Sequence, residues 1–323
     1  MRAIRIRHAD LVVSRIAYGC MKIGARRGDA DGAATKDAAF RALAAARDAG
    51  IDFFDHADIY AGGESESVFG QWLAASPGLR DRVVIQSKCG IRLAGRPRPE
   101  DPQRYDFSRA HILESVEGSL RRLRTDRLDL LLLHRPDPLA EPAEVAQAFD
   151  ELHDAGKVRH FGVSNHTRGQ IEVLQRHVRR PLAVNQVELS LTHAHLIDAG
   201  IVANRAGASG ALAEGTLDFC RVHDITVQAW GPVGGGRLLA ADPAEDSAWG
   251  RTARLLNETA ARHGAPPEAV LVAWLLRHPA GLQPVIGSTR PERIEAACRA
   301  DAIDLSREEW YALFTAARGA RVP

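Results

Sequence analysis

Four residues whose chemistry could serve one reaction stand at, or just after, the ends of short apolar runs. Asp55 and Tyr60 lie in "GIDFFDHADIY", Lys88 ends "RVVIQSK" and His134 ends "RLDLLLLH". The free phenol has a pKa near ~10, and a neighbouring lysine ammonium would lower it by roughly 1–3 units. A buried lysine stays charged only when it is paired, and Asp55 is the acid placed to pair with Lys88. Together, these side chains could let Tyr60 protonate a carbonyl oxygen that His134 orients.

Each residue alone has a plainer interpretation. A single acid such as Asp55 after a strand is commonly a helix cap, and a lone histidine there is usually a satisfied polar residue. Only the ordered set of four favours catalysis. In the same stretch, His56 and Asp58 are expected to form a hydrogen-bonded loop pair and stay outside the catalytic set. Cys89 should face away from its neighbour Lys88 and be a buried, inert thiol.

Short apolar runs alternate about eight times with longer segments of helical periodicity, which predicts a single (β/α)8 TIM-barrel domain over residues 1–323. A β-hairpin is expected first, in Arg2–Val13. The predicted strands lie in "RIAYGC", "DFFDHAD", "RVVIQSK", "RLDLLLLH", "RHFGVSN", "LAVNQVEL", "ITVQAWG" and "LQPVIGS". The predicted helices include Asp37–Ala49, Ser65–Ala75, Ala110–Leu123, Glu144–Ala155, Gly169–His177 and a last one near Ser306–Gly319.

The carboxyl ends of the strands form one face of such a barrel, so the four candidate residues would meet there. Three long loops are expected on the same face, at Gly90–Asp106, Thr192–Glu214 and Pro232–Ala248. Loops of this length are more easily explained as walls of a pocket than as simple connections. The sequence assigns no role to the second of them.

Composition narrows the class of protein. The 323 residues carry a formal charge of +1 and are 45% hydrophobic, which favours a soluble globular protein with no nucleic-acid or membrane partner. Four widely spaced cysteines, with no CxxC pair, argue against a disulfide framework or zinc site and favour the cytoplasm. His193 and His195 lack a third ligand at a useful spacing, so we expect a solvated loop and no metal.

None of the four candidate residues can donate a hydride, so a redox reaction would need a cofactor bound from solution. A Rossmann site is not indicated, because "GCMKIGARRG" has the wrong spacing for GxGxxG. "PVIGSTRPERIEAA" instead leaves the last strand and begins a helix at Pro291, with Arg290 and Arg293 nearby, which is typical of an anion site. Before it, "AWGPVGGGRLL" supplies Trp230, which could stack on a nicotinamide or simply fill the core, and glycines that admit a pyrophosphate.

The ordered motifs "FFDHADIY", "IQSKCG", "LLLHRPD", "FGVSN", "NQVE", "QAWGPVGGGRL" and "VIGSTRPERI" resemble the aldo-keto reductase superfamily from about Tyr18 to Ala297. "HRPDPL" and "GKVRHFGVSN" are most similar to its bacterial YdhF-like oxidoreductases. The resemblance implies an NADP-dependent oxidoreductase that reduces a small-molecule carbonyl, an aldehyde or ketone, to an alcohol. It also implies that the catalytic tetrad is Asp55, Tyr60, Lys88 and His134.

The resemblance also implies a cofactor site. Ser164, Asn165 and Gln186 would bind the nicotinamide carboxamide, Trp230 would stack beneath the ring, and Asp55 would lie beside it. The cleft would be lined by Gly19, Cys20 and Met21. The pyrophosphate would follow Gly231, Pro232, Val233, Gly234, Gly235 and Arg237. The adenosine 2′-phosphate would bind near Gly287, at Ser288, Thr289, Arg290 and Arg293, and the arginines favour NADPH over NADH.

Two departures leave alternatives open. Trp230 stands where many members have tyrosine, a feature that suggests the potassium-channel β-subunit branch and a redox-sensing or regulatory subunit that binds NADPH with little turnover. Ala297 stands where many relatives have asparagine near the adenine. A barrel hydrolase or isomerase without a dinucleotide is a third hypothesis. The sequence indicates neither the physiological substrate, nor the preferred direction, nor the oligomeric state.

Overall fold

The structure is a computed structural model that describes residues 1–24, 32–202 and 215–323. Eight parallel strands form a closed barrel, in which the last strand pairs with the first through Val285–Ala17 and Ile286–Tyr18. The predicted (β/α)8 barrel is confirmed, and each of the eight predicted strand segments contributes one strand. In chain order these are β3 (Ala17–Gly19), β4 (Phe53–Asp55), β5 (Val84–Cys89), β8 (Leu128–Leu133), β9 (Val158–Ser164), β10 (Leu182–Glu188), β11 (Thr226–Trp230) and β12 (Gln283–Ile286).

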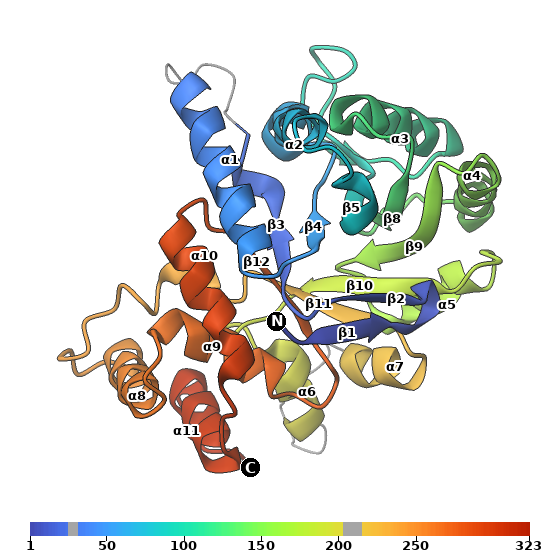
Figure 1. Ribbon diagram of the computed structural model, residues 1–323. Helices are drawn as coiled ribbons and strands as arrows, with labels where there is room; N and C mark the ends of the chain where they lie inside the picture. The colour runs from blue at the N-terminus through green and yellow to red at the C-terminus, as the bar shows by residue number, and fades with distance from the viewer. Residues whose placement is uncertain (25–31, 203–214) are drawn as a thin grey trace.

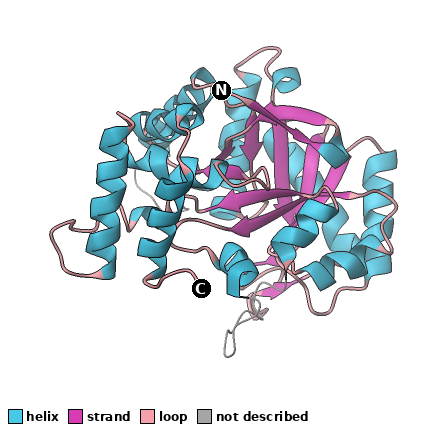
Figure 2. Cartoon of the chain, turned by 90° about the horizontal axis from the view of Figure 1, so that it is seen from below, coloured by secondary structure: helices cyan, strands magenta, loops and turns pink. Residues whose placement is uncertain are grey.

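Helices surround the barrel, and Figure 2 shows the strands enclosed by them. In Figure 1, α8, α9 and α11 group on the side where the chain ends. All residues of β8 are buried, because one face lines the lumen and the other packs against helices. None of the helices in the described residues has the length and apolar character needed to cross a membrane. The helices are α1 (Gly32–Asp48), α2 (Glu64–Ala74), α3 (Arg109–Leu123), α4 (Pro142–Asp154), α5 (Arg168–Gln175), α6 (His195–Val202), α7 (Thr216–Val222), α8 (Ala248–Arg262), α9 (Pro267–Leu276), α10 (Pro291–Cys298) and α11 (Arg307–Arg318).

The predicted N-terminal hairpin is present as β1 (Ala3–Ile6) and β2 (Leu11–Ser14), which pair antiparallel. Ile6 and Val13 are buried and share a cluster with Phe53, Leu130 and Val184, which belong to barrel strands. The hairpin therefore closes one end of the lumen with apolar side chains. The open end is left at the carboxyl ends of the strands, where the polar candidates lie.

Close helix packing fixes the segment that follows β4. A Cβ atom at Gly70 of α2 would lie only 2.2 Å from the Arg122 carbonyl oxygen of α3, so the two backbones meet where only glycine fits. The fully buried Glu66 of α2 accepts a hydrogen bond from Arg122 Nε at 2.8 Å and another from Ser87 Oγ at 2.6 Å. Because α2 begins just after Tyr60, these contacts hold the Tyr60 turn against β5.

The three long segments predicted as loops contain regular structure, which corrects that part of the prediction. Residues 90–106 include an antiparallel pair, β6 (Ile91–Arg92) with β7 (Arg104–Tyr105). Helix α6 occupies much of the described part of 192–214. Its Ile197 and Val202 are buried, and Asp198 pairs with Arg318 at 2.6 Å. Residues 203–214 lie outside the described residues. The third segment contains the 3-10 turn η6 (Gly234–Gly236).

Candidate active site

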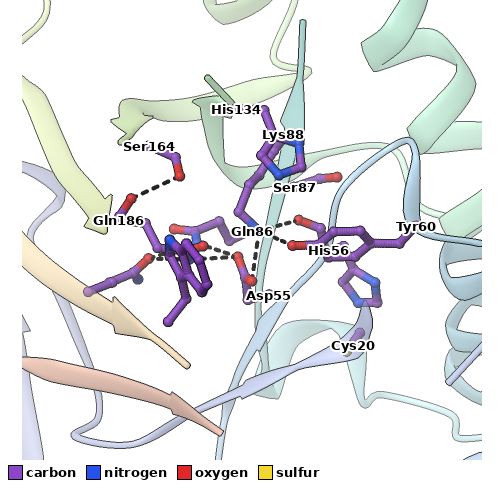
Figure 3. Close-up of polar contacts among 12 residues, drawn as sticks. Cys20, Asp55, His56, Tyr60, Gln86, Ser87, Lys88, His134, Ser164 and Gln186 are labelled. Atoms are coloured by element: carbon purple, nitrogen blue, oxygen red, sulfur yellow. Dashed lines mark hydrogen bonds and ion pairs between the residues drawn. The ribbon is translucent and has the colours of Figure 1, made fainter. Parts of the chain in front are cut away.

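The four predicted catalytic residues lie in one cluster at the carboxyl ends of neighbouring strands (Figure 3). Asp55 ends β4, Tyr60 opens the 3-10 turn η3 (Tyr60–Gly63), Lys88 lies on β5 and His134 directly follows β8. Lys88 Nζ donates to Asp55 Oδ2 at 2.7 Å and to the Tyr60 hydroxyl at 3.0 Å. The rings of Tyr60 and His134 meet edge to face, with centroids 5.8 Å apart. Asp55 therefore pairs with a cation and does not cap a helix.

Lys88 is held as a cation although its side chain is only 1% exposed. Burial by itself would lower the pKa of Lys88, but Asp55 and Tyr60 outweigh burial and raise that pKa above its ordinary value. A third hydrogen bond runs from Nζ to the His56 carbonyl oxygen at 2.9 Å. An ammonium group has three donors, so all of them are used and the charge has one fixed position.

The net shift of the Tyr60 pKa differs from the sequence-based expectation. Burial raises the pKa of Tyr60, and Lys88 offsets only part of this effect because Asp55 acts in the opposite direction. Tyr60 is therefore protonated at neutral pH, which is the form that can donate a proton. The fixed charge of Lys88 remains beside the oxygen on which negative charge develops when the proton leaves.

His134 is an uncharged hydrogen-bonding group. Burial, followed by the positive charges of Lys88 and Arg135, holds the pKa of His134 well below its ordinary value. The His134 Nδ1 atom is buried and has no hydrogen-bond partner in the described part of the chain. A neutral imidazole has one N–H donor, so the ring can orient a carbonyl oxygen without competing with Tyr60 as an acid.

A cavity of about 590 Å³ opens onto this cluster from the carboxyl ends of the strands. Lys88 does not line the cavity and lies behind Tyr60. The predicted site residues that do line it come from the ends of β3, β4, β9, β10, β11 and β12 and from segments that follow β8 and several of these strands. They are Gly19, Met21, Asp55, Tyr60, His134, Ser164, Asn165, Gln186, Trp230, Gly231, Pro232, Val233, Gly234, Gly235, Arg237, Gly287, Ser288 and Arg293.

Three predicted cofactor residues, Cys20, Thr289 and Arg290, are not among the residues that line this cavity. Cys20 is fully buried, and its Sγ lies 3.8 Å from the Tyr18 carbonyl oxygen, because the backbone turns after β3 and directs this side chain into the core. Thr289 and Arg290 follow Ser288 in the turn that enters α10. Of the two arginines predicted at the 2′-phosphate, only Arg293 lines the cavity.

Polar groups at one end of the cavity are arranged as hydrogen-bond acceptors. Both N–H groups of Gln186 are used, at 3.0 Å to Asp55 and 2.9 Å to Gln228. The Asn165 amide nitrogen donates to Ser164 Oγ at 2.8 Å and to the His134 carbonyl oxygen at 3.3 Å. The remaining acceptor positions are therefore on the oxygens of Gln186 and Asn165, where the Asn165 oxygen accepts from Trp230 and keeps one lone pair, and they match the NH₂ group of a carboxamide. The Asn165 backbone lies in the left-handed region, with φ of 60°.

The flat ring of Trp230 lies beside these acceptors, where its indole nitrogen donates to Asn165 Oδ1 at 3.1 Å. The glycine segment that follows has positive φ at Gly231, Gly234, Gly235 and Gly236, which side chains would strain. A Cβ atom at Gly235 or Gly236 would meet no heavy atom within 4 Å, so the backbone is open to a bound group. These features fit a nicotinamide stacked near Trp230 and phosphates along the glycine segment.

Sequence reasoning did not single out several residues that line the same cavity: Lys22, Arg135, Glu188, Leu239, Glu268, Val285 and Ile286. Arg135 directly follows His134, and its guanidinium lies 5.7 Å from the centroid of the Trp230 ring. Glu188 ends β10, in the quoted motif "NQVE". Their positions at strand ends were a usable signal, because every strand end in this fold faces the same side.

His56 and Asp58 do not form the expected hydrogen-bonded loop pair. Neither ring nitrogen of His56 has a hydrogen-bond partner in the described residues, and the ring packs edge-on against Phe69 at 4.5 Å between centroids. Burial, and then the nearby Glu66, raises the pKa of Asp58 to about 7. Cys89 is buried, and burial raises the pKa of its thiol well above the ordinary value, as expected for an inert thiol.

The two histidines of "THAH" lie where the chain enters α6, and their ring centroids are 4.5 Å apart. His193 Nε2 is also 3.8 Å from a Glu188 carboxylate oxygen. Within residues 1–24, 32–202 and 215–323, no group of three or more histidine, cysteine or acidic side chains is placed to hold a metal ion.

Comparison with known proteins gives one consistent result. The model of the Aldo/keto reductase family matches residues 15–317. Oxidoreductase YdhF of Escherichia coli is 42% identical over 279 residues, covering 85% of this chain and 86% of that protein. A 6-dehydroglucose reductase of Agrobacterium fabrum is 38% identical over 314 residues, covering 97% of each protein. The glycerol dehydrogenase AKR11B4 of Gluconobacter oxydans superposes with a TM-score of 0.79 at 26% identity, covering 99% of this chain and 97% of that one.

Proposed function

The chain belongs to the aldo/keto reductase family, and from that premise we propose that it is an NADPH-dependent oxidoreductase that reduces a carbonyl compound to an alcohol. The observation that carries the proposal is the contact between the Tyr60 hydroxyl and the buried, charged Lys88 at the wall of a cavity that His134 and Trp230 also line. This arrangement supports delivery of a proton to an oxygen bound in that cavity.

The residues of the tetrad have distinct tasks in this proposal. His134, which is neutral, donates a hydrogen bond to the carbonyl oxygen and turns it toward Tyr60. Tyr60 gives its proton to that oxygen, and Lys88, kept charged by Asp55, stabilises the phenolate that remains. A bound reduced nicotinamide would supply the hydride to the carbonyl carbon. Trp230, Asn165 and Gln186 would hold its ring and carboxamide.

The preference for NADPH over NADH is also a proposal. Ser288 and Arg293 lie at the end of the cavity formed after β12, at the start of α10. A guanidinium binds a phosphate dianion more strongly than a ribose hydroxyl, which supports recognition of the adenosine 2′-phosphate there. Glu268 lines the same cavity and adds a negative charge, so the preference depends on Arg293 outweighing it.

We propose a polar aldehyde as the substrate. Lys22, Arg135 and Glu188 add charged groups to the cavity, and Arg135 makes no ion pair within 4 Å with a carboxylate of the described residues. Such groups can bind hydroxyl or anionic substituents of a small molecule. Similarity over almost the whole chain to a 6-dehydroglucose reductase also favours a hydroxylated aldehyde.

We further propose that residues 1–323 act as one domain, because the hairpin closes the barrel and Arg2 is hydrogen-bonded to Asp301, beyond α10. The four cysteines are unpaired, three of them buried, which supports a reducing location such as the cytoplasm.

The decisive experiment measures NADPH consumption with a hydroxylated aldehyde and with one reactive aromatic aldehyde. Tyr60→Phe should lose activity by about 10²–10⁴-fold, whereas Tyr105→Phe, a matched change on β7 outside the cavity lining, should retain it. Wild-type turnover in Tyr60→Phe would contradict the proposal. Tight NADPH binding by wild type, with slow release and no turnover of either aldehyde, would instead favour a regulatory subunit.

A further inference from the structure

Four glutamines in the barrel wall form a continuous hydrogen-bonded chain that begins at Asp55. Gln86 Nε2 donates to Asp55 Oδ1 at 2.6 Å and to Gln228 Oε1 at 2.8 Å. Gln186 Nε2 donates to the same two oxygens, at 3.0 and 2.9 Å. Gln228 Nε2 donates to Gln283 Oε1 at 2.9 Å. All four glutamine side chains are at most 2% exposed, and Figure 3 shows Gln86 and Gln186 converging on Asp55.

At the end opposite Asp55, the glutamine chain reaches a main-chain carbonyl group. Gln283 Nε2 donates at 2.9 Å to the oxygen of Ser14, the last residue of the N-terminal hairpin. A carbonyl oxygen and a carboxylate both accept hydrogen bonds and cannot donate them. The chain therefore has an acceptor at each end, and the amide groups between them have only one consistent orientation.

That orientation follows step by step from the hairpin. Because Ser14 can only accept, Gln283 must turn its nitrogen toward Ser14 and its oxygen toward Gln228. Gln228 then presents its nitrogen to Gln283 and its oxygen to Gln86 and Gln186. Both of these must present N–H groups to Gln228, and their remaining N–H groups point at Asp55.

This orientation of the amides leaves one buried oxygen atom of the described residues without a hydrogen bond. Gln86 Oε1 is buried and has no hydrogen-bond partner in the described residues. An unsatisfied buried carbonyl oxygen is unfavourable, and reversing the amide would place that oxygen against Asp55. Gln86 therefore leaves its acceptor unpaired so that both of its donors are used, one of them on the carboxylate of the candidate active site.

We propose that Gln86, oriented by Gln228, is a positioning residue that holds the Asp55 carboxylate with its other oxygen turned to Lys88. This inference rests on the proposed function, because it assigns these residues to the same reaction. Gln86 and Gln186 occupy Oδ1 with two donors, which leaves Oδ2 to accept from Lys88 at 2.7 Å. These contacts do not make either glutamine a catalytic residue, because the glutamine chain acts on Tyr60 only through Asp55 and Lys88.

Loss of the Gln86 donor should raise the pKa of Tyr60. The titratable groups that face Tyr60 are Asp55 on β4, Lys88 on β5, His134 after β8 and Cys20 after β3. Without the Gln86 donor, Gln186 alone holds Asp55 Oδ1, and the contact of Oδ2 with Lys88 Nζ is less well fixed. Lys88 Nζ is then held less firmly beside the Tyr60 hydroxyl, which disfavours the phenolate, so the pKa of Tyr60 rises.

The test uses tyrosine labelled with ¹³C at Cζ, because the chain has only four tyrosines and Tyr60→Phe identifies the signal. At a fixed pH of about 10, Gln86→Met and Gln228→Met should lower the phenolate fraction of Tyr60 by roughly 3–10-fold, a pKa shift of about 0.5–1 unit. Oxidation of an alcohol with NADP⁺, which needs the phenolate, should slow by the same factor. Unchanged titration in folded Met variants would overturn the proposal.

Two further variants separate orientation from simple loss of packing. The buried carboxyl group introduced by Gln228→Glu would be protonated, so this variant supplies an O–H for Gln283 and a carbonyl oxygen for Gln86 and should preserve the wild-type titration. Asn185→Leu removes a buried amide of β10 that donates to the His166 carbonyl oxygen at 3.0 Å, outside this chain, and should leave Tyr60 unchanged. Equal shifts in Asn185→Leu and Gln86→Met would contradict the proposal.

If either methionine variant fails to fold, Gln228→Asn keeps the amide but is too short to reach both partners, and it should shift the titration in the same direction. The labelled-tyrosine measurement needs no turnover, so it stands even if the protein reduces no aldehyde. If the methionine variants shift the Tyr60 titration as expected but the wild type reduces no aldehyde, only the proposed function is contradicted. If the wild type is active but the variants leave the titration unchanged, only the role of the glutamine chain is contradicted.

Discussion

Lys88 Nζ lies 3.0 Å from the Tyr60 hydroxyl oxygen, although the two residues belong to different segments of the chain. The contact places a permanent charge next to a phenol that burial keeps protonated. Tyr60 is therefore ready to act as an acid, and the charge that would stabilise its conjugate base is already in place.

Lys88→Met should reduce aldehyde turnover by about 10²–10⁴-fold, because the phenolate loses its stabilising cation. The same change leaves Asp55 as an unpaired buried charge, which should cost about 3–5 kcal/mol of unfolding free energy. Denaturant unfolding of Lys88→Met and of the double variant Asp55→Asn/Lys88→Met measures this. The double variant should recover stability without activity, and recovery of activity would contradict the role of Lys88.

His134 should orient the substrate as a neutral donor. His134→Phe should lower kcat by about 10²–10³-fold, whereas His134→Gln, which keeps an N–H donor, should lose less. Because the pKa of His134 is far below its ordinary value, the pH profile of kcat/KM for wild type should show no change attributable to this ring at neutral pH. An acidic limb near neutrality that disappears in His134→Gln would contradict this assignment.

Arg293 and Arg290 should differ in their contribution to cofactor preference, because only Arg293 lines the cavity. Arg293→Ala should weaken NADPH binding by about tenfold or more and leave NADH binding nearly unchanged. Arg290→Ala is the matched control and should have a much smaller effect. Dissociation constants from nicotinamide fluorescence measure both, and a larger loss in Arg290→Ala would refute the placement of the 2′-phosphate.

Asp58 should make stability depend on pH in a defined direction. Burial raises its folded pKa from 3.8 to about 7, so its protonated form is favoured in the native state. Its contribution to stability is fully present below about pH 4 and is lost as the pH rises through about 7. Asp58→Asn should therefore raise the free energy of unfolding at pH 8 by on the order of 1–3 kcal/mol, with a higher melting temperature. At pH 4 it should have little effect on either quantity. A difference that grows toward acid pH would contradict this sign.

Gly70→Ala should destabilise the protein by about 1–3 kcal/mol, because its Cβ would meet the Arg122 carbonyl oxygen of α3. Gly169→Ala on α5 is the control, since a Cβ there meets no heavy atom within 4 Å and alanine favours helices by up to about 1 kcal/mol. Thermal unfolding of both variants measures the difference. Equal stability in the two would show that α2 and α3 do not pack as closely as described.

The sequence by itself determined the barrel and the positions of the tetrad. Each strand is short and apolar and ends in, or is followed by, a polar residue or glycine, and the parallel connections put all carboxyl ends on one face. Residues at strand ends, such as Asp55 and His134, could therefore be assigned to one site before their contacts were known. Local pattern was sufficient there because the position of a residue along its strand decides which end of the barrel it reaches.

Only the tertiary structure decided which side chains meet across the barrel. Gln86 and Gln228 are hydrogen-bonded although 142 positions separate them, and their contact depends on closure and register of the whole barrel. The direction of the Tyr60 pKa shift likewise reflects a balance between burial and two opposite charges, which no local sequence encodes. Cys20 is buried although Gly19 and Met21, on either side of it, line the cavity, because the turn after β3 sets the direction of each side chain.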